Sequence, residues 1–439
     1  MKVAIAGFGA EGRASLSYWD TLENDVTVVD ERETIDDLPE AVETILGPDA
    51  FSQLGDFDLV VRTAGLSPHK IVTNGKVWSA TNEFFAKCPA PIIGVTGTKG
   101  KGTTASLIAS ILSAAGKTVH LVGNIGTPAL EVLPSITSRD VVVYELSSFQ
   151  LWDLEKSPFI AVVLMIEPDH LDTHQSFDEY IASKANIRRH QGMDDYCIYH
   201  PTNKWSQQIA TTGPDTPARA EWDARAGRYG IADDGQVYVK ENTFFTQDTA
   251  ICSVDALQLP GMHNQENACA ALSVALHFTK INAVMERGLS SFKGLPHRLE
   301  FVRELYDVAY YNDSFSSAPG ATIAAIKAFD RPEILILGGT DKGADFTELA
   351  QAISDNHQVK QLVIMGVIRQ KLADFLKEQG VTVAMDIVDA TTMQEVITHA
   401  REYAESGDII ILSPACASFD MFKNFYDRGD QFRSIVQAL

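Results

Sequence analysis

The chain has little cysteine, and no two of its cysteines form a close pair. Five cysteines occur in 439 residues, and none belongs to a CxxC motif. A scattered, odd-numbered set excludes a disulfide-rich secreted scaffold and a cysteine-based zinc site. It favours reduced thiols in the cytosol.

Basic residues are scarce relative to acidic ones. The chain has 36 lysines and arginines against 58 aspartates and glutamates, which gives a formal charge of −22. Such a surface repels polyanions, so we expect no nucleic-acid partner and no anionic membrane partner. No apolar run reaches about 18 residues, and no signal-peptide pattern opens the sequence. We therefore expect a soluble, cytoplasmic protein.

The length and the apolar pattern predict a multidomain α/β protein. A chain of 439 residues exceeds what one hydrophobic core supports. Short, nearly continuous apolar runs alternate with helical stretches, as in parallel sheets covered on both faces. We expect a Rossmann-like domain at 1–88, a central P-loop ATPase-like domain with a parallel sheet at 89–296, and a doubly wound α/β domain at 297–439.

Individual runs predict strands and helices within these domains. Residues 200–255 are polar and punctuated by glycine and aspartate, which indicates β-hairpins or an irregular insertion. The predicted strands are 2–6, 26–29, 59–63, 118–122, 140–144, 159–165, 308–311, 334–337, 361–365 and 409–412. The predicted helices include 261–277, 321–329, 369–379 and 392–404.

A glycine-rich turn at 94–104 carries the clearest chemical signal. It reads Gly-Val-Thr-Gly-Thr-Lys-Gly-Lys-Gly-Thr-Thr and follows an apolar run. The N–H groups of such a turn and the start of the next helix bind phosphate, and Lys101 can reach the β- and γ-phosphates. Gly102 stands where the usual P-loop has a hydroxyl, so Thr103 is the first candidate for Mg²⁺. The sequence predicts a nucleoside triphosphate site; a ligand-free turn is the alternative.

A second glycine motif, Gly-x-Gly-x-x-Gly at 7–12, opens the chain. It follows a strand pattern, and Asp30 ends the next strand, as in dinucleotide-binding βαβ units. On its own this motif is a weak signal. A tight turn without a nucleotide and an NAD-binding loop both remain open.

Carboxylates and histidines follow the later central strands. Glu145 ends a buried strand, at the sheet edge where ligands bind, and suits Mg²⁺ ligation near a P-loop. His170 lies in Glu-Pro-Asp-His-Leu-Asp-Thr-His and fits metal binding or proton transfer, although a lone histidine is more often structural. Zinc is disfavoured because HExxH is absent. Lys184 alone would be interpreted as a solvated helix lysine.

Taken together, these motifs follow one order along nearly the whole chain. In that order and spacing the chain resembles the Mur ligase family, and its glycine loop also resembles that of folylpolyglutamate synthetases. The segments that carry the resemblance are 94–101, 123–126, 145–150, 168–172, Lys184, 263–267, 294–298, 312–314 and 413–418.

The resemblance implies an ATP-dependent amide ligase. ATP would phosphorylate the free carboxylate of UDP-N-acetylmuramoyl-L-alanine, and the amine of glutamate, most simply D-glutamate, would then displace phosphate. Lysine, Mg²⁺ and loop N–H groups would offset the repulsion between the two anions. The implied cofactors are ATP and Mg²⁺, the implied partners are the UDP-sugar and glutamate, and we expect a monomer.

The resemblance also assigns residues to each ligand. Those for ATP are Gly97, Thr98, Lys99, Gly100, Lys101, Gly102, Thr103, Thr104, Asn264, Asn267, Arg298 and Asp313. Those for catalysis are Lys101, His170 and Lys184, the last as a carbamate. Those for Mg²⁺ are Thr103 or Thr104, Glu145, His170 and Lys184. Those for the UDP-sugar are Gly9, Ala10, Glu11, Asp30, Arg32, Gly65, Asn124, Ser147 and Gln150. Those for glutamate are Ser317, Lys342, Ser418 and Phe425.

The chain departs from the family pattern in the implied glutamate pocket. Phe315 stands where the family has lysine, and Ala318 stands where it has asparagine. A missing lysine beside an acidic substrate leaves L-glutamate open as the substrate. Three further hypotheses are a folylpolyglutamate synthetase-like ligase, which the N-terminal domain disfavours, an NAD-dependent oxidoreductase, and a non-catalytic nucleotide-binding regulator.

Overall fold

The computed structural model describes residues 1–35, 38–39, 41–125, 127–213, 226–230, 235–341 and 343–439. Two compact units emerge: one comprises 1–257 and 265–292, and the other comprises 258–264 and 293–439. The three domain boundaries expected from the sequence stay a prediction. Among the described residues, no helix has both the length and the apolar character needed to cross a bilayer.

The chain begins with a parallel sheet of order β3-β2-β1-β4-β5. Its faces are covered differently, because β1 alternates between two cores: Val3 and Ile5 pack with α1 and α2, and Ala4 and Ala6 pack with η1. At Gly7 the φ angle is +92°, and a Cβ would lie 2.3 Å from the hydroxyl of Thr63, so only glycine fits this turn. The elements are β1 Lys2–Ala6, α1 Ala10–Trp19, β2 Asp25–Asp30, β3 Glu43–Leu46, η1 Ala50–Gln53, β4 Leu59–Arg62, η2 Pro68–Lys70, β5 Lys76–Ser79 and α2 Ala80–Lys87.

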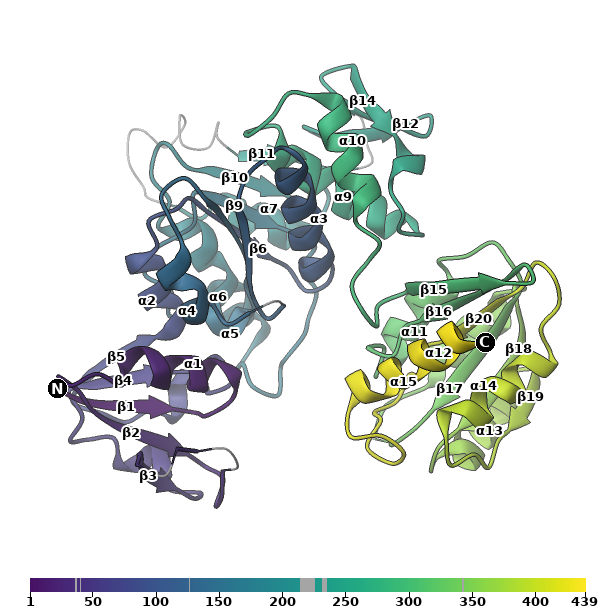
Figure 1. Cartoon of the computed structure of the whole chain (residues 1–439), viewed down its shortest axis with the longest axis horizontal. Helices are drawn as coiled ribbons and strands as arrows, with labels where there is room; N and C mark the ends of the chain where they lie inside the picture. Colours follow the sequence, from purple (N-terminus) through teal and green to yellow (C-terminus); the bar gives the residue numbers. More distant parts are fainter. Residues whose placement is uncertain (36–37, 40, 126, 214–225, 231–234, 342) are drawn as a thin grey trace. The chain divides into compact units, whose positions relative to one another are not determined.

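The central sheet is also parallel, in the order β11-β10-β9-β6-β8-β7. The face that presents Val142 and Tyr144 packs with α4 and α6, and α3 covers the other face (Figure 1). The strands are β6 Ile92–Thr96, β7 Val119–Gly123, β8 Val141–Glu145, β9 Ile160–Val163, β10 Tyr196–Tyr199 and β11 Ala226–Arg228. The helices are α3 Lys101–Ala114, α4 Ala129–Val132, η3 Leu133–Ser135, α5 Ser148–Leu151, α6 Phe177–Arg189 and α7 Lys204–Ala210.

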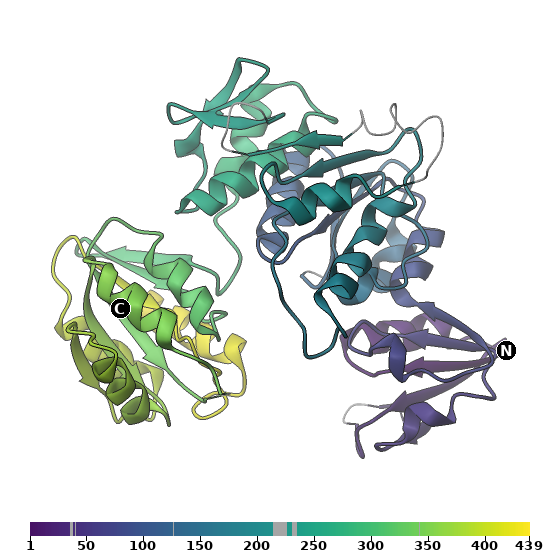
Figure 2. The ribbon, with the colours of Figure 1, turned by 180° about the vertical axis from the view of Figure 1, so that it is seen from behind.

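The polar segment 200–255 contains hairpins, as its composition predicts. Strands β12 Tyr238–Lys240, β13 Thr243–Thr246 and β14 Thr249–Ser253 form an antiparallel sheet (Figure 2). The sequence did not predict α7 in this segment, and the parts at 214–225 and 231–234 lie outside the described residues. The elements that follow are η4 Val254–Ala256, α9 Met262–Ala275 and α10 Asn282–Ser291.

The N-terminal and central sheets share one hydrophobic core. Side chains of β1, α1 and α2 belong to the same buried cluster as side chains of α4, β8 and α6, and α4 packs against both α1 and α2. The edge of this core therefore brings loops from both sheets together.

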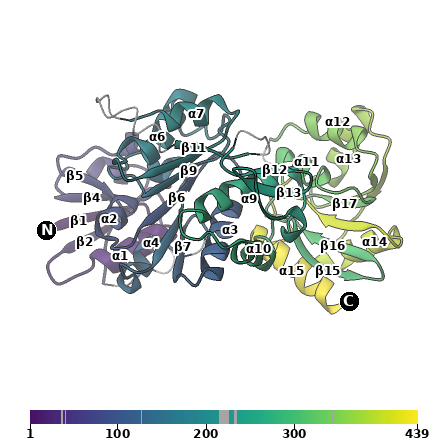
Figure 3. The ribbon, with the colours of Figure 1, turned by 90° about the horizontal axis from the view of Figure 1, so that it is seen from above.

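The second unit has a sheet of order β15-β16-β20-β17-β18-β19, parallel except for the β15–β16 pair. Helices α11, α12 and α13 bury one face, and α14 and α15 bury the other (Figure 3). The strands are β15 Glu300–Leu305, β16 Val308–Asn312, β17 Glu333–Gly338, β18 Val359–Met365, β19 Ala384–Ile387 and β20 Ile409–Leu412. The helices are α11 Pro319–Ile326, α12 Thr347–Asp355, α13 Arg369–Glu378, α14 Met393–Glu402 and α15 Phe425–Ala438.

Candidate active site

The glycine loop joins β6 to α3 at the carboxyl edge of the central sheet. Helix α3 begins at Lys101, and Gly100 before it has a left-handed φ of 81°. The ammonium of Lys101 donates to the carbonyl of Thr98 at 3.0 Å and lies 3.9 Å from the carboxylate of Glu145. A glycine turn and a helix N-terminus thus lie at the end of a strand, beside a lysine and a carboxylate. The N–H groups of the turn and the helix N-terminus are suited to binding phosphate.

The end of the neighbouring strand holds the loop in place. The N–H of Thr98 donates to the carbonyl of Met165 at 2.8 Å, and the hydroxyl of Thr98 accepts the N–H of Glu167 at 2.9 Å. The same hydroxyl lies 3.0 Å from that of Tyr180 in α6. Lys99 is exposed and pairs with Glu167 at 3.2 Å, so it points away from the turn's interior.

Two threonines follow Lys101 in the chain, and the structure gives them different environments. Thr104 is buried, and its hydroxyl donates to the side-chain oxygen of Asn267 at 3.2 Å. Thr103 is only partly buried. Because Thr104 is fully buried whereas Thr103 is partly exposed, Thr103 is the better candidate for a metal. Asn267 also touches the loop, since a Cβ at Gly100 would lie 2.4 Å from its oxygen.

Lys184 is not an exposed helix residue: only 1% of it is accessible. Its nitrogen donates to the hydroxyl of Thr96 at 3.2 Å and to the carbonyl of Gly97 at 3.0 Å. Burial, and next the nearby charge of Lys101, hold the pKa of this amine well below its usual range. The interpretation of Lys184 as a solvated lysine is therefore wrong, because α6 directs it beneath the glycine loop.

His170 lies in the loop after β9 but is exposed. It has a left-handed φ of 53°, and its ring packs 4.9 Å from that of Phe149 and 3.5 Å from the Asp169 carboxylate. His174, which the sequence did not single out, is the buried histidine here, and it bonds to the hydroxyl of Ser148 at 3.0 Å. Within the described part of the chain, no three His, Cys, Asp or Glu side chains form a metal-binding group.

Asp30 and Arg32 form a bridge at the carboxyl end of β2. The Arg32 guanidinium donates to both carboxylate oxygens at 2.8 Å and to the carbonyl of Phe8 at 2.9 Å, and the N–H of Phe8 donates to Asp30 at 2.8 Å. Although burial raises it, hydrogen bonds from Arg32 and Phe8 lower the pKa of Asp30 overall. The charged carboxylate is thus fixed beside the first glycine turn.

Glu11, in the first turn of α1, bonds to the loop after β4 and to α5 at this edge. Its carboxylate accepts the N–H of Ala64 at 2.6 Å and the side-chain amide of Gln150 at 3.5 Å. Burial raises the pKa of Glu11, which favours the neutral form of its carboxyl group. Gln150 also closes a capping box with Ser147 at the start of α5. The remaining expected UDP-sugar residues are exposed: Gly9, Ala10, Gly65 and Asn124.

The second unit carries its own group of expected residues at the carboxyl end of β16. Asp313 is buried and accepts the hydroxyls of Ser316 at 2.5 Å and Ser413 at 2.7 Å. Burial raises the pKa of Asp313 to about 6. The guanidinium of Arg298 lies 3.8 Å from the ring centroid of Phe315. Asn264, also in this unit, donates to the carbonyl of Pro260 at 2.7 Å.

Of the expected glutamate residues, Phe425 packs against Phe315, the residue that departs from the family pattern. The rings of Phe315 and Phe425 meet edge to face, with centroids 5.0 Å apart. Ser418 is buried and Ser317 is exposed. Lys342 lies outside the described residues.

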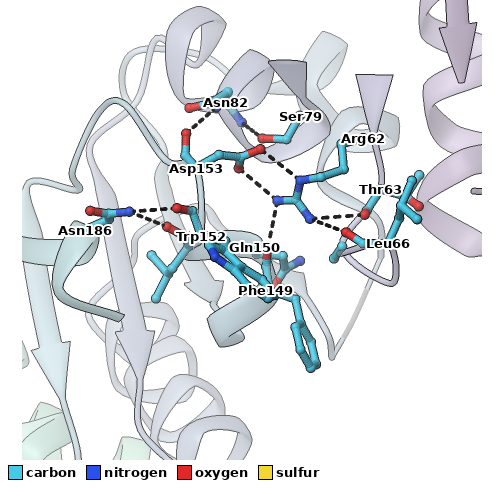
Figure 4. Close-up of polar contacts among 12 residues, drawn as sticks. Arg62, Thr63, Leu66, Ser79, Asn82, Phe149, Gln150, Trp152, Asp153 and Asn186 are labelled. Atoms are coloured by element: carbon cyan, nitrogen blue, oxygen red, sulfur yellow. Dashed lines mark hydrogen bonds and ion pairs between the residues drawn. The ribbon is translucent and has the colours of Figure 1, made fainter. Parts of the chain in front are cut away.

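Two buried arginines, Arg62 and Arg428, were not among the residues that the sequence analysis assigned to any ligand. Arg428 donates to Ser314 and to the carbonyl of Cys416, and burial lowers its pKa to about 10. Arg62 ends β4 and donates to Asp153 and to three carbonyls (Figure 4). The sequence feature that could have identified Arg62 is its position as a basic residue at the end of an otherwise apolar strand.

Comparisons with known proteins define the class to which this fold and site belong. Residues 95–275 match the Mur ligase middle domain, and residues 297–416 match the Mur ligase glutamate ligase domain. With the full-length relatives below, this shows that the chain belongs to the Mur ligase family.

The chain is similar over its whole length to enzymes named UDP-N-acetylmuramoylalanine–D-glutamate ligase. The Clostridium tetani enzyme is 36% identical, and the match covers 100% of this chain and 97% of that protein. The Ruminiclostridium cellulolyticum enzyme is 37% identical with the same coverage. In fold, the chain resembles the crystal structure of UDP-N-acetylmuramate-alanine ligase MurC from Thermotoga maritima, with a TM-score of 0.61, 16% identity, and coverage of 100% of this chain and 99% of that one.

Proposed function

We propose that this chain is an ATP-dependent ligase that adds D-glutamate to UDP-N-acetylmuramoyl-L-alanine, releasing ADP and phosphate, in cytoplasmic peptidoglycan precursor synthesis. The observation that carries the proposal is the group of Lys101, Glu145 and Lys184 around the glycine loop, where α3 begins. The full-length similarity to D-glutamate ligases supports the choice of substrates.

The loop supplies the charge that the first step needs. A carboxylate and a triphosphate repel each other, so their reaction requires fixed positive groups at the transferring phosphoryl. The helix N-terminus at Lys101 and the ammonium of Lys101 provide these, and the 3.9 Å contact with Glu145 holds the ammonium at the sheet edge. The amine of glutamate then attacks the acyl phosphate, a carbon–nitrogen bond forms, and phosphate leaves.

The residues fit Mg²⁺ in the manner that is usual for nucleotide enzymes. Mg²⁺ is commonly held by one or two carboxylates, a hydroxyl and substrate phosphates rather than by an all-protein cage. Glu145 supplies a nearly buried carboxylate and Thr103 a partly exposed hydroxyl, whereas the described residues offer no larger acidic or histidine cluster. Bound Mg²⁺ would neutralise phosphate charge.

Lys184 fits a carbamate better than a permanent ammonium. Its depressed pKa raises the fraction of uncharged amine above that of an ordinary lysine, and the uncharged amine is the form that adds CO₂. The resulting carboxylate-like group would suit a second Mg²⁺ site, and His170 is proposed as its partner from the family resemblance.

The N-terminal sheet is proposed to hold the UDP moiety. Asp30 and Arg32 form a fixed polar pair beside the first glycine turn, and Glu11 and Gln150 line the same edge. With this assignment both glycine loops have a function: the first binds the UDP moiety and the second binds ATP. An NAD-dependent oxidoreductase would explain the first loop but leave the P-loop without a function. A glutamate ligase that accepts L-glutamate is the second candidate, because Phe315 replaces a lysine.

The decisive experiment measures phosphate release with ATP and UDP-N-acetylmuramoyl-L-alanine. D-glutamate should give phosphate release and an amide product by mass spectrometry, and L-glutamate should give little. Preference for L-glutamate would transfer the assignment to the second candidate. Lack of activity with either enantiomer, together with turnover of a folate substrate, would overturn the proposal.

A further inference from the structure

Arg62 is a charged residue in a fully buried position. It is the last residue of β4, follows Leu59, Val60 and Val61, and has 0% of its surface accessible. Removing a guanidinium from water is costly unless its donors and its charge are satisfied. The residues around Arg62 must therefore supply hydrogen-bond acceptors and a negative charge for its guanidinium.

Five N–H groups are available on a guanidinium, and all five find acceptors here. Two of them form a bidentate pair with the carboxylate of Asp153, each at 2.9 Å. The others reach the carbonyls of Phe149 at 2.8 Å, Leu66 at 3.0 Å and Thr63 at 3.3 Å (Figure 4).

These acceptors belong to two sheets. Thr63 and Leu66 form the loop after β4 of the N-terminal sheet, whereas Phe149 and Asp153 come from α5 and the residues after it, at the edge of the central sheet. Asn82 of α2 adds a second bridge, because its amide donates to the carbonyl of Asp153 at 2.8 Å.

The two joined segments are the ones expected to touch the UDP-sugar. The loop at 63–66 carries Gly65, and the segment at 147–153 carries Ser147 and Gln150. Glu11 reaches across both, to the N–H of Ala64 and the amide of Gln150. The Arg62 guanidinium thus bonds to both sides of the proposed binding edge, and Asn82 and Glu11 add further links between them.

We propose that Arg62 and Asp153 are a positioning pair that sets the UDP-sugar edge by locking the 63–66 loop to the 147–153 segment. Neither residue is assigned a role by the family resemblance, and the inference rests on the proposed function. Arg62 acts through Gly65, Ser147 and Gln150 and does not touch the reacting atoms.

The test compares Michaelis constants in two conservative variants, Arg62→Lys and Asp153→Asn. A lysine cannot satisfy a carboxylate and three carbonyls together, and an asparagine leaves the guanidinium without its counter-charge. The KM for UDP-N-acetylmuramoyl-L-alanine should rise by about tenfold or more, since small misplacements of binding groups have effects of that size. The KM for ATP should change by less than about twofold, because the glycine loop keeps its own anchors.

Arg188→Lys is the matched control for loss of stability. Arg188 is also fully buried in the first unit, and its hydrogen bonds include those to the carbonyl of Ala210 and to the side chain of Gln191. It should lower the midpoint of thermal unfolding as Arg62→Lys does, while leaving the KM for the UDP-sugar within about twofold of wild type.

An apolar replacement separates positioning from stability further. Well-packed apolar residues in place of a buried ion pair often keep or raise stability. Arg62→Met combined with Asp153→Leu should therefore fold more stably than either single variant and still show the raised KM. Calorimetric titration with UDP should show the same weakening without any turnover.

The outcomes distinguish this inference from the proposed function. If wild type uses the UDP-sugar but the Arg62 and Asp153 variants match Arg188→Lys in KM, the positioning role is wrong and the function stands. If the UDP-sugar KM and the ATP KM rise equally, the pair supports the unit as a whole rather than this edge. If wild type neither turns over the UDP-sugar nor binds UDP, both proposals fall.

Discussion

The side-chain nitrogen of Lys184 donates a 3.0 Å hydrogen bond to the carbonyl oxygen of Gly97, although the two residues lie 87 positions apart in the chain. The lysine comes from α6 and the carbonyl from the first turn of the glycine loop. Burial there, and the charge of Lys101, depress the pKa of the amine. The amine therefore reaches its uncharged state at a lower pH than an ordinary lysine does.

Replacing Lys184 tests whether that uncharged amine becomes a carbamate. Lys184→Ala should lower turnover by roughly a hundredfold, the scale of losing one preorganised electrostatic group. Added acetate or formate should partly restore turnover, because either can supply the missing carboxylate. Carbon-13 NMR of wild type in labelled bicarbonate should show a carbamate signal. An active enzyme whose crystal structure and mass show only a plain amine would contradict this prediction.

Lys101 is expected to serve the transferring phosphoryl group. Lys101→Ala should also reduce kcat by about a hundredfold or more, because the ammonium acts where charge develops. Thermal unfolding is measured alongside, because the ammonium bonds the carbonyl of Thr98 and lies 3.9 Å from the buried carboxylate of Glu145, so a loss of stability must be separated from the loss of kcat. Lys117→Ala, at an exposed lysine beyond the other end of α3, is the control and should behave as wild type. Equal activity of the two variants would remove the phosphate role from the glycine loop.

Asp30 tests the placement of the UDP moiety. Asp30→Asn keeps the shape of the side chain but loses the charge that pairs with Arg32, so the KM for the UDP-sugar should rise while the KM for ATP holds. Asp58→Asn, at the opposite end of the same sheet, should change neither constant. A larger effect on ATP than on the UDP-sugar would mean that the two nucleotides have been exchanged in our assignment.

Glu333 makes the free energy of unfolding depend on pH. It is fully buried at the start of β17, neither of its carboxylate oxygens has a hydrogen-bond partner among the described residues, and burial raises its pKa to about 8. Because the folded pKa exceeds the unfolded value of 4.5, the folded state binds more protons between these values, and stability falls as pH rises from about 5 to 8.

Glu333→Leu should remove this dependence. At about 1.4 kcal/mol per pKa unit, the stabilisation by the substitution should be about 3 kcal/mol larger at pH 8 than at pH 5. Denaturant unfolding at the two pH values measures it, and Glu348→Leu at an exposed site of α12 controls for loss of a surface carboxylate. A stabilisation independent of pH would show that Glu333 stays ionised in the folded protein.

Phe315 tests which enantiomer of glutamate the pocket accepts. Its ring packs on Phe425 and under the guanidinium of Arg298. If D-glutamate is the substrate, Phe315→Lys should lower the KM for D-glutamate by roughly two- to fivefold, as expected for an added exposed charge pair. Phe315→Leu separates loss of the ring from gain of the charge. The other outcome is that the wild type prefers L-glutamate and that Phe315→Lys weakens its use of L-glutamate. In that case the second candidate function holds.

Strands whose apolar runs are continuous were predicted well from the sequence. β1 and β20 have the expected bounds, because buried parallel strands such as Ile409–Leu412 leave little ambiguity. The polar edge strands β3, β15 and β19 were missed, since their residues face solvent on at least one side and lack a strong period. Their pairing is set by the neighbouring strand rather than by their own composition.

The candidate site was predicted unevenly for a similar reason. Motif spacing located Lys101 and Glu145, which the structure places 3.9 Å apart. Spacing could not reveal that Lys184 is buried, that His174 rather than His170 is enclosed, or that Arg62 bonds to Asp153, which is 91 residues away. Such contacts depend on which loops the tertiary fold brings to one edge.

The side chain of Asn267 occupies the space that a side chain at Gly100 would need. A side chain at Gly100 would meet the Asn267 oxygen at 2.4 Å in a backbone conformation that other residues rarely adopt, and that oxygen accepts the hydroxyl of Thr104. A side chain added at Gly100 would therefore require Asn267 to move or to be replaced by a smaller residue. Among homologous sequences a side chain at the position of Gly100 should therefore accompany a change at the position of Asn267, although the two are distant in the chain.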